Sequence, residues 1–224
     1  AQMPALVEGH QISGCLSADA ARELGLPSGI PVVGGAGDNA ASAIGIGAVK
    51  AGDSFVSLGT SGVLFSVTDR HRPNVGEAVH AFCHALPGVW HQMAVMLSAA
   101  SSLTWITRVT GHANEGELLA KVALLSAAER NGAPIFLPYL SGERTPHNDA
   151  TASGSFLGLR HAHEAAHLAY AVIEGVSFGL RDGLDAMRRA GSRVEEVQLV
   201  GGGSRSALWA RYRNAPIDRD CSVG

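Results

Sequence analysis

Asp38 occupies a position from which a carboxylate could remove a proton from a hydroxyl group. It follows the glycine-rich turn 34–37 and precedes an Ala- and Ile-rich segment that extends to Val49. This pattern predicts a strand at 31–33, a tight turn, Asp38 as the N-cap and then a short helix. The helix dipole and the exposed backbone amides would stabilise a charged carboxylate, which could accept the proton of a hydroxyl that attacks a phosphoryl group. An ordinary N-cap Asp gives the same local pattern, and that pattern alone favours the simpler interpretation.

Two more glycine clusters could approach a phosphate or a nucleotide closely. Residues 59–62 (GTSG) join the β-prone runs 55–58 and 63–67, so the sequence predicts a hairpin. Its turn offers several amides and two hydroxyls to phosphate oxygens, although no Lys follows as in a Walker A loop. The second cluster, 201–203, lies between a predicted strand and a predicted helix start at Ser204, where a nucleotide could lie against bare backbone. On spacing alone, a plain tight turn and a close strand-to-helix packing turn are the favoured interpretations of these clusters.

A group of imidazole and thiol side chains invites a zinc interpretation, since both are zinc ligands. These residues are His80, Cys83, His84 and His91. If 80–86 is extended, alternate residues face opposite ways, so His80 and His84 share a face from which Cys83 is absent. We therefore interpret the histidines as core or loop residues and expect no metal site here.

The motif SGERTPH (141–147) places Glu143, Arg144 and His147 in a loop that a proline interrupts. Charges of both signs in such a loop fit a salt-bridged surface turn. They fit the lining of a cleft equally well, and the spacing does not decide between the two.

Alternating strand and helix patterns must position these residues. A strand at 91–96 passes into a helix at about 98–110, and 134–137 is another short strand. A long helix is predicted at 162–190, because apolar residues recur every four positions on one face and Gly191 follows as a stop. The chain is therefore expected to have a mixed α/β fold.

The composition is that of an ordinary soluble globular protein with enough apolar residues for a buried core. Of its 224 residues, 46% are hydrophobic and 17% are charged, and the formal net charge is −3. No Lys/Arg run is longer than two, so we expect a small-molecule partner rather than nucleic acid or an anionic membrane. No apolar run is long enough to span a bilayer, and we expect a cytoplasmic protein with reduced thiols at Cys15, Cys83 and Cys221.

Five segments taken together resemble the FGGY family of carbohydrate kinases. They are GGAGDNAASAIGIG (34–47), SLGTSGVLF (57–65), HAFCHALPGVWHQMAVMLSAASSLTW (80–105), FLPYLSGERTPHND (136–149) and LVGGGSRSALW (199–209). The resemblance implies an actin-like (ribonuclease H-like) ATPase fold, incomplete here, in which two α/β domains close on ATP and a sugar. It also implies that 1–50 are the C-terminal part of the first, sugar-binding domain. Residues 51–224 would be the N-terminal part of the second, nucleotide-binding domain.

The resemblance further implies a reaction, the ATP-dependent phosphorylation of D-xylulose to D-xylulose 5-phosphate, with Mg²⁺ accompanying the ATP. Asp38 is similar to the family's catalytic base, and Asp38 and Asn39 are expected to bind the sugar. The turn 59–62 looks like the loop that holds the β- and γ-phosphates, and 201–204 looks like the adenosine-binding element. No residue is assigned to a metal. The expected ATP-binding residues are Gly59, Thr60, Ser61, Gly62, Ala100, Thr104, Gly202, Gly203 and Ser204.

The chain departs from the family in its length and near its end. It opens partway into the first domain, so we expect the N-terminal phosphate loop and most sugar-binding residues to lie outside it, and we expect this piece alone to be inactive. After Trp209, the run 211–216 lacks the apolar helix that is usual in the family. The alternatives are a related kinase for another sugar or polyol, or an actin-like nucleotide-binding protein, and a homodimer stays open.

Overall fold

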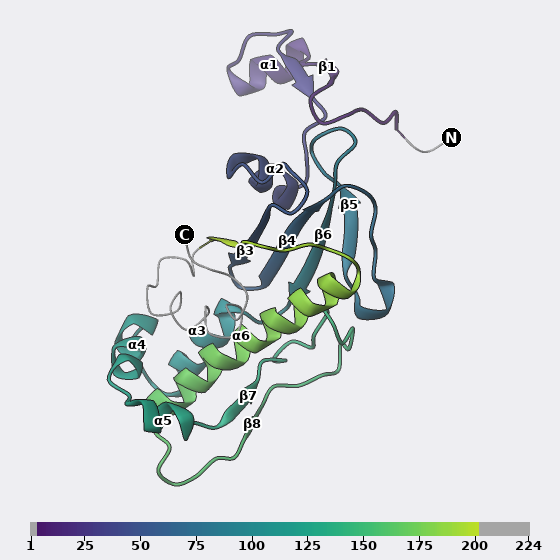
Figure 1. Cartoon of the computed structure of the whole chain (residues 1–224). Coiled ribbons are helices and arrows are strands. Elements are labelled where there is room, and N and C mark those ends of the chain that lie inside the picture. Colours follow the sequence, from purple (N-terminus) through teal and green to yellow (C-terminus); the bar gives the residue numbers. More distant parts are fainter. Residues whose placement is uncertain (1–3, 202–224) are drawn as a thin grey trace.

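The computed structural model describes residues 4–201, and its centre is a five-stranded sheet with helices against both faces (Figure 1). The strands are β1 (Ile12–Cys15), β2 (Pro31–Val33), β3 (Ser54–Leu58), β4 (Gly62–Thr68), β5 (His80–Cys83), β6 (Trp90–Met96), β7 (Ile135–Leu137), β8 (Ser155–Leu157) and β9 (Gln198–Val200). The helices are α1 (Ala18–Leu24), α2 (Asp38–Gly45), the 3-10 helix η1 (Val75–Glu77), α3 (Ala100–Val109), α4 (Glu115–Ala123), α5 (Ala127–Asn131) and α6 (Ala165–Arg189).

The central sheet has the strand order β5-β6-β4-β3-β9. Strands β3 and β4 form the predicted hairpin, paired from Ser54↔Ser66 to Leu58↔Gly62. Strand β9 is the exception to the antiparallel pattern, because it runs parallel to β3, with Ser57 opposite Val200. The carboxyl ends of β3 and β9 therefore emerge at the same edge of the sheet, which is where open α/β sheets commonly bind ligands.

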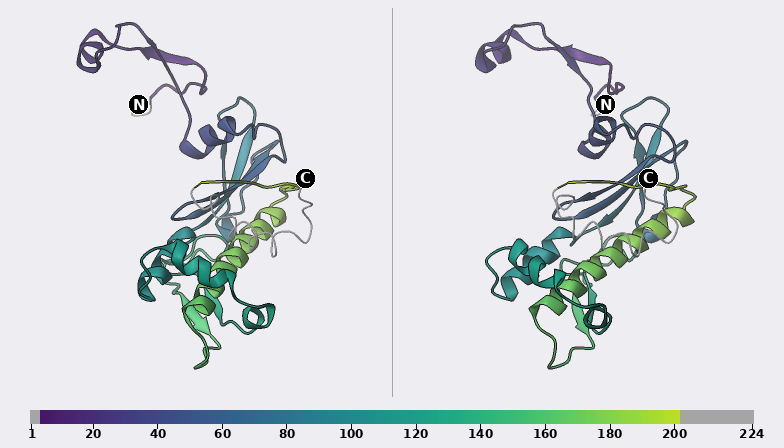
Figure 2. Two further views of the ribbon diagram at one scale, coloured as in Figure 1. Left: turned by 90° about the vertical axis from the view of Figure 1, so that its left-hand side faces the viewer. Right: turned by 60° about the vertical axis from the view of Figure 1, so that its left-hand side comes forward.

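Helix α6 crosses one face of the sheet and carries most of the core (Figure 2). Its residues Val172, Val176, Leu180 and Leu184 recur every four positions and are almost completely buried. They pack with Val56, Leu58 and Leu64 of the hairpin, and with apolar side chains of α3 and α4. The long helix predicted from this spacing is confirmed, and its ends lie within three residues of those expected.

The opposite face of the hairpin packs under α2. Because side chains alternate along a strand, Phe55, Phe65 and Val67 point away from α6 and form a second cluster with Ala43 and Ala48. The rings of Phe55 and Phe65 stack with centroids 4.7 Å apart, and both residues are fully buried. Burying two phenylalanines contributes about 2 kcal/mol each. This cluster fixes α2, and with it Asp38, to the start of β3.

Helix α2 differs from the prediction at both ends. Its N-cap is Gly37, and Asp38 is the first helical residue rather than the cap. The helix ends at Gly45 instead of Val49, because the chain turns at Gly47, whose φ of 79° is in the left-handed region that favours glycine.

The N-terminal residues form a small unit, of which only the strand at 31–33 was predicted. The hairpin of β1 and β2 encloses α1 (Figure 1), and α1 begins after Ser17, whose hydroxyl accepts a hydrogen bond from the Ala20 amide. The apolar side chains of both strands are exposed in the described structure. Helices α4 and α5 and strand β8 were not predicted either.

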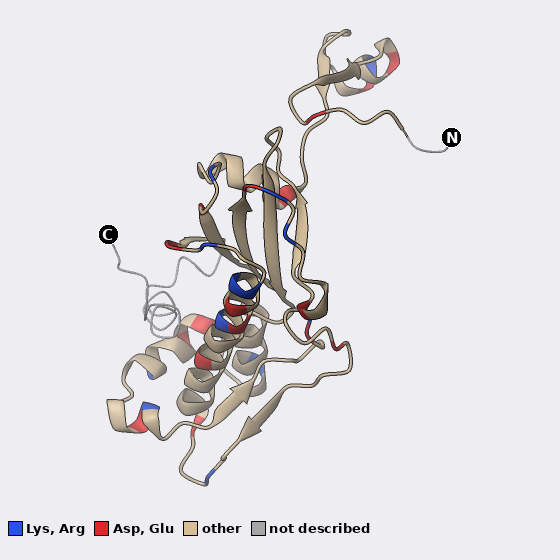
Figure 3. Cartoon of the chain, turned by 45° about the vertical axis from the view of Figure 1, so that its right-hand side comes forward, with Lys and Arg blue, Asp and Glu red and all other residues tan. Residues whose placement is uncertain are grey.

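Charged residues of both signs alternate along the outer surface of α6 (Figure 3). Asp185 accepts from Arg181 at 3.1 Å and lies 3.6 Å from Arg188, so this surface is a network of helical ion pairs. None of the helices formed by residues 4–201 combines the length and apolar character that crossing a bilayer requires.

Helix α6 approaches β7 so closely at Gly175 that a methyl group there would lie 2.3 Å from the Phe136 carbonyl oxygen. We expect Gly175→Ala to lower the free energy of unfolding by about 3 kcal/mol, because backbone would have to move. The matched change Gly179→Ala meets only the flexible end of Met96, at 2.9 Å. Alanine has a higher helix propensity than glycine by about 1 kcal/mol, and this gain would offset much of the unfavourable free energy of that contact. Urea unfolding of the two variants measures the difference, and equal losses would contradict this account of the packing.

Candidate functional site

The turn between β3 and β4 is bound to the first residues of α3 through its carbonyl groups. The Ala99 amide donates to the Thr60 carbonyl at 3.0 Å, and the Ala100 amide donates to the Gly59 carbonyl at 3.0 Å. The Ser101 hydroxyl also donates to the Thr60 carbonyl, at 2.8 Å. Helix α3 has no side-chain cap at Ala99, so the turn takes the place of a capping residue.

This arrangement leaves the donors at the tip of the turn free, while the Gly59 amide donates to the Ser61 carbonyl at 3.1 Å. Within residues 4–201, the amides and hydroxyls of Thr60 and Ser61 donate no hydrogen bond, and Thr60 is exposed. Gly62 closes the turn where there is little room for a side chain, since its added methyl group would lie 3.1 Å from Leu180 and 3.2 Å from Ala99. Free amides at Thr60 and Ser61, beside carbonyls of Gly59 and Thr60 that are occupied by α3, present partial positive charge at the tip of the turn, which suits an anion such as phosphate.

Strand β9 brings a second glycine to the same edge. Gly201 has φ of 90°, and a methyl group there would lie 2.9 Å from the Leu58 carbonyl oxygen, so both conformation and space demand glycine. Gly201 therefore lies beside the last residue before the turn 59–62. The predicted nucleotide contacts Gly202, Gly203 and Ser204 and the predicted helix start at Ser204 lie outside the described residues.

Next to the turn is a hollow of about 380 Å³ on the surface of α3. It unites three of the predicted ATP-binding residues, Thr60, Ala100 and Thr104. The full lining is Thr60, Ala100, Ser101, Thr104, Trp105 and Arg108. Trp105 and Arg108 were missed, although the positions 100, 104 and 108 follow the four-residue spacing of one helix face, which could have identified Arg108.

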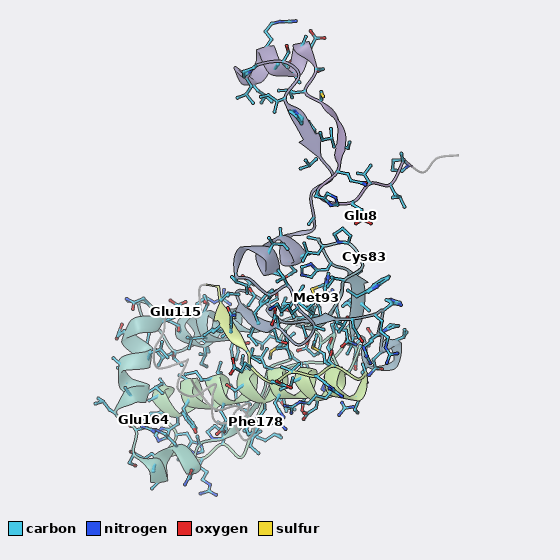
Figure 4. All side chains as sticks on the ribbon, turned by 45° about the horizontal axis from the view of Figure 1, so that its top comes forward. Glu8, Cys83, Met93, Glu115, Glu164 and Phe178 are labelled. Atoms are coloured by element: carbon cyan, nitrogen blue, oxygen red, sulfur yellow. The ribbon has the colours of Figure 1, made fainter. Side chains whose placement is uncertain are left out.

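The hydroxyl of Thr104 already has a partner. It donates to the Glu115 carboxylate at 2.7 Å, and this hydrogen bond lowers the pKa of Glu115. Glu115 is the first residue of α4 (Figure 4), so the contact joins α3 to α4. Thr104 thus borders the hollow, but its hydroxyl is committed to the fold.

Asp38 is exposed at the start of α2. Its Oδ1 accepts hydrogen bonds from the Asn39 amide at 2.9 Å and the Asn39 side chain at 3.3 Å, so the two predicted sugar-binding residues are in contact. Ala43 of α2 packs against Phe55 at the start of β3, whereas α3 begins beside the turn that follows β3. No hydrogen bond or ion pair among residues 4–201 joins Asp38 to Thr60.

The histidines grouped in the sequence lie beneath α2 and around Phe65. The His91 ring stacks on Phe65 with centroids 4.4 Å apart, and His84 lies 6.0 Å from His91. His84 Nδ1 accepts from the Leu86 amide at 3.2 Å, whereas His91 Nδ1 is buried and has no hydrogen-bond partner among the described residues. Burial, and secondarily His84, lowers the pKa of His91 to about 4. His84 and His91 are part of the core, whereas His80 is half-buried and Cys83 is exposed.

The motif SGERTPH is partly buried, because Glu143 and Thr145 point inward while Arg144 and His147 are exposed. Glu143 is 3% exposed, and its carboxylate accepts from the backbone amides of Leu97 at 2.9 Å and Arg144 at 2.8 Å. His147 contacts the Tyr139 hydroxyl at 2.9 Å. The motif is a loop beside the end of β6 that Glu143 and Thr145 attach to the backbone of that strand and of Leu97, and its exposed residues leave the choice between a surface turn and a cleft lining open.

A larger hollow of about 970 Å³ lies at the start of β3 and the end of α6, away from the turn 59–62. It is lined by charges of both signs, including the Asp69–Arg72 ion pair at 3.0 Å. None of the predicted site residues lines it, and its size alone does not indicate a ligand.

Comparison with known proteins decides the family. Residues 54–214 match the C-terminal domain of the FGGY family of carbohydrate kinases, and residues 1–45 match its N-terminal domain. The chain belongs to the FGGY family of carbohydrate kinases. As the resemblance implied, its fold is the actin-like fold of this family. The two family matches together cover most of the chain, and individual members of the family are similar to it as well.

The chain is similar to the xylulose kinase of Escherichia coli K12, with 49% identity over 209 residues. These residues are 93% of this chain and 42% of that protein. The crystal structure of a xyloylose kinase from Brucella ovis superimposes with a TM-score of 0.86 and 51% identity, over 95% of this chain and 43% of that one. The crystal structure of a gluconate kinase from Lactobacillus acidophilus superimposes with a TM-score of 0.84 and 26% identity, over 95% of this chain and 43% of that one. The chain thus spans about two fifths of the length of the relatives that it matches.

The buried His91 predicts an acid-sensitive fold. Its ordinary pKa is 6.5 and its folded-state pKa is about 4, so below pH 6.5 the unfolded chain binds a proton that the folded chain does not. Stability therefore falls as pH is lowered from 6.5 to 4, by about 3 kcal/mol for this group. We expect His91→Phe, which keeps a ring on Phe65, to flatten the pH dependence of the free energy of unfolding. The control His10→Phe, at an exposed histidine, should not, and an unchanged slope in His91→Phe would refute the assignment.

Proposed function

We propose that the protein containing this chain transfers the γ-phosphoryl group of ATP to D-xylulose and forms D-xylulose 5-phosphate. The observation that carries phosphoryl transfer is the turn 59–62, whose carbonyls bind α3 while the donors of Thr60 and Ser61 stay free. The choice of sugar rests on the 49% identity with the E. coli xylulose kinase. Both the turn and Asp38 fall within the matched family segments.

In this proposal, the amides of Thr60 and Ser61 and the Thr60 hydroxyl hold the β- and γ-phosphates. The hollow along Ala100 and Thr104 and the backbone that follows Gly201 receive the rest of the nucleotide. The carbonyl-capped start of α3 supports the turn and is not itself an anion site, because its amides are used. Mg²⁺, bound by the phosphates themselves, would neutralise the charge of the transferring group.

Asp38 would act as the general base. It takes the proton from the terminal hydroxyl of the sugar while that oxygen bonds to the γ-phosphorus, and the bond from phosphorus to the bridging oxygen breaks to release ADP. Asn39, whose amide groups donate to Asp38, would orient the carboxylate and contact the sugar.

The position of Asp38 adds a requirement to this mechanism. We infer a division into a sugar-binding part, 1–50, and a nucleotide-binding part, 51–224, which puts Asp38 and Thr60 on different parts. Since no contact among the described residues joins Asp38 to Thr60, the extended triphosphate and a closing movement of the two parts would together bring the reacting groups into contact.

A second candidate is phosphorylation of a different sugar. The likeness to a gluconate kinase, with a TM-score of 0.84, means that this fold accompanies more than one sugar substrate. A cytoplasmic location and a homodimer stay predictions.

The base is tested by Asp38→Asn in a full-length protein that carries this chain. Asparagine keeps the size and removes the basic oxygen, so we expect D-xylulose-dependent ADP release to fall by about 10²- to 10⁴-fold while ATP binding is kept. Coupled measurement of ADP release and of ATP affinity checks both. Retained turnover would remove Asp38 from this role, stimulation by another sugar only would favour the second candidate, and hydrolysis independent of any sugar would favour an actin-like nucleotide-binding protein.

The phosphate turn is tested by Thr60→Val, which removes the hydroxyl and keeps the shape. Loss of a hydrogen bond to a charged phosphate should raise the KM for ATP about 10-fold and leave the KM for D-xylulose unchanged. The control is Thr104→Val in the same hollow, where the hydroxyl is already bonded to Glu115. An equal or larger effect on ATP in the control would mean that Thr60 does not contact the nucleotide.

A further inference from the structure

Strand β6 extends beyond the strand that covers its outer edge. Strand β5 pairs with β6 only from Trp90 to Met93, and the backbone beyond Met93 would be bare on that side. The SGERTPH loop occupies this place. The Thr145 amide donates to the Val95 carbonyl at 3.1 Å, and the Val95 amide donates to the Thr145 hydroxyl at 3.1 Å.

Glu143 continues this pairing with its side chain. Its Oε1 accepts from the Leu97 amide at 2.9 Å, one residue past the end of β6. The loop is itself fixed by two backbone hydrogen bonds of 2.8 Å between Glu143 and Asp149. Burial raises the pKa of Glu143, while the hydrogen bonds from the Leu97 and Arg144 amides oppose that rise. A carboxylate is costly to bury, so these amide bonds account for its position.

The contact at Leu97 is connected directly to the turn 59–62. Two residues after Leu97, the Ala99 amide donates to the Thr60 carbonyl, and the Ala100 amide donates to the Gly59 carbonyl. The segment 97–100 is therefore held at one end by Glu143 and binds the turn at the other. Freeing the first end would loosen the second, because only Ser98 separates Leu97 from Ala99.

We propose that Glu143 is a positioning residue for phosphate binding, which through the Leu97 amide fixes segment 97–100 and thereby the turn 59–62. This inference rests on the proposed function for the identity of the ligand, but not for the mechanical connection. Glu143 does not touch the nucleotide. Its loss should weaken the binding of ATP and leave the binding of the sugar unaltered.

Three substitutions separate the contact from the bulk and charge of the side chain. Glutamine keeps an acceptor oxygen at the same reach, aspartate keeps the charge but is one methylene too short for Leu97, and alanine removes both. Amide hydrogen exchange of this chain, followed by NMR, reports the outcome at Ala99 and Ala100. We expect exchange at these amides to accelerate at least 10-fold in Glu143→Ala, less in Glu143→Asp, and not in Glu143→Gln.

Asp53→Ala is the matched control. Asp53 Oδ2 likewise accepts two backbone amides, from Val49 at 2.9 Å and Lys50 at 2.8 Å, but at the start of β3. Its loss should accelerate exchange near Val49 and not at Ala99 or Ala100. If Glu143→Ala does not fold, the comparison of Asp with Gln decides the matter, and equal exchange at Ala99 in those two would overturn the proposal.

Kinetics in a full-length protein that carries this chain supply the functional readout. Glu143→Asp should raise the KM for ATP several-fold, leave the KM for the sugar unchanged and be rescued in Glu143→Gln. If the wild type does not use ATP, the proposed function fails while the exchange result still tests Glu143. If the wild type uses ATP and the Asp and Gln variants share its KM for ATP, the proposal for Glu143 fails and the proposed function stands.

Discussion

The carbonyl groups of the turn 59–62 cap helix α3, and the geometry of the candidate site depends on this contact. A helix leaves its first amides without partners inside the helix, and leaving them unpaired on a folded protein is costly. Helix α3 has no capping side chain, so the carbonyls of Gly59 and Thr60 satisfy its first amides. With these two carbonyls bound to the helix, the amides and hydroxyls of Thr60 and Ser61 stay free of partners among the described residues. The same interaction therefore stabilises α3 and prepares a surface for an anion.

The sheet topology brings the remaining parts of the site to this surface. Because β9 is parallel to β3, both strands end at the same edge, and Gly201 fits against the Leu58 carbonyl where no side chain could. Helix α6 packs behind the hairpin and limits the space at Gly62. Close backbone approach thus requires glycine at Gly201, whereas at Gly62 the space is limited by the side chains of Leu180 and Ala99. Helix α2, which begins at Asp38, is attached to β3 through the Phe55 and Phe65 cluster, and a closing movement of the two parts belongs to the proposed mechanism.

Local patterns allowed much of the fold to be predicted. The hairpin of β3 and β4 follows from two β-prone runs around a glycine turn. Helix α6 follows from apolar residues that recur at every fourth position. Contacts between distant segments could not be predicted. The burial of Glu143 depends on β5 pairing with β6 only from Trp90 to Met93, which no local spacing reveals. The hydrogen bond from Thr104 to Glu115 depends on where α4 packs. Asp38 was expected to be an N-cap, yet Gly37 takes that position, because residue type alone does not fix where the first helical turn begins.

The most direct test of the central claim is the amide signal of Thr60 in a full-length protein that carries this chain and is labelled with ¹⁵N only at threonine. Titration with Mg·ATP should shift the Thr60 signal with the same saturation curve as ATP binding, because that amide would donate to a phosphate oxygen. The Thr104 amide, within α3, should shift less. A Thr60 signal that stays unchanged when the protein is saturated with ATP would contradict the account.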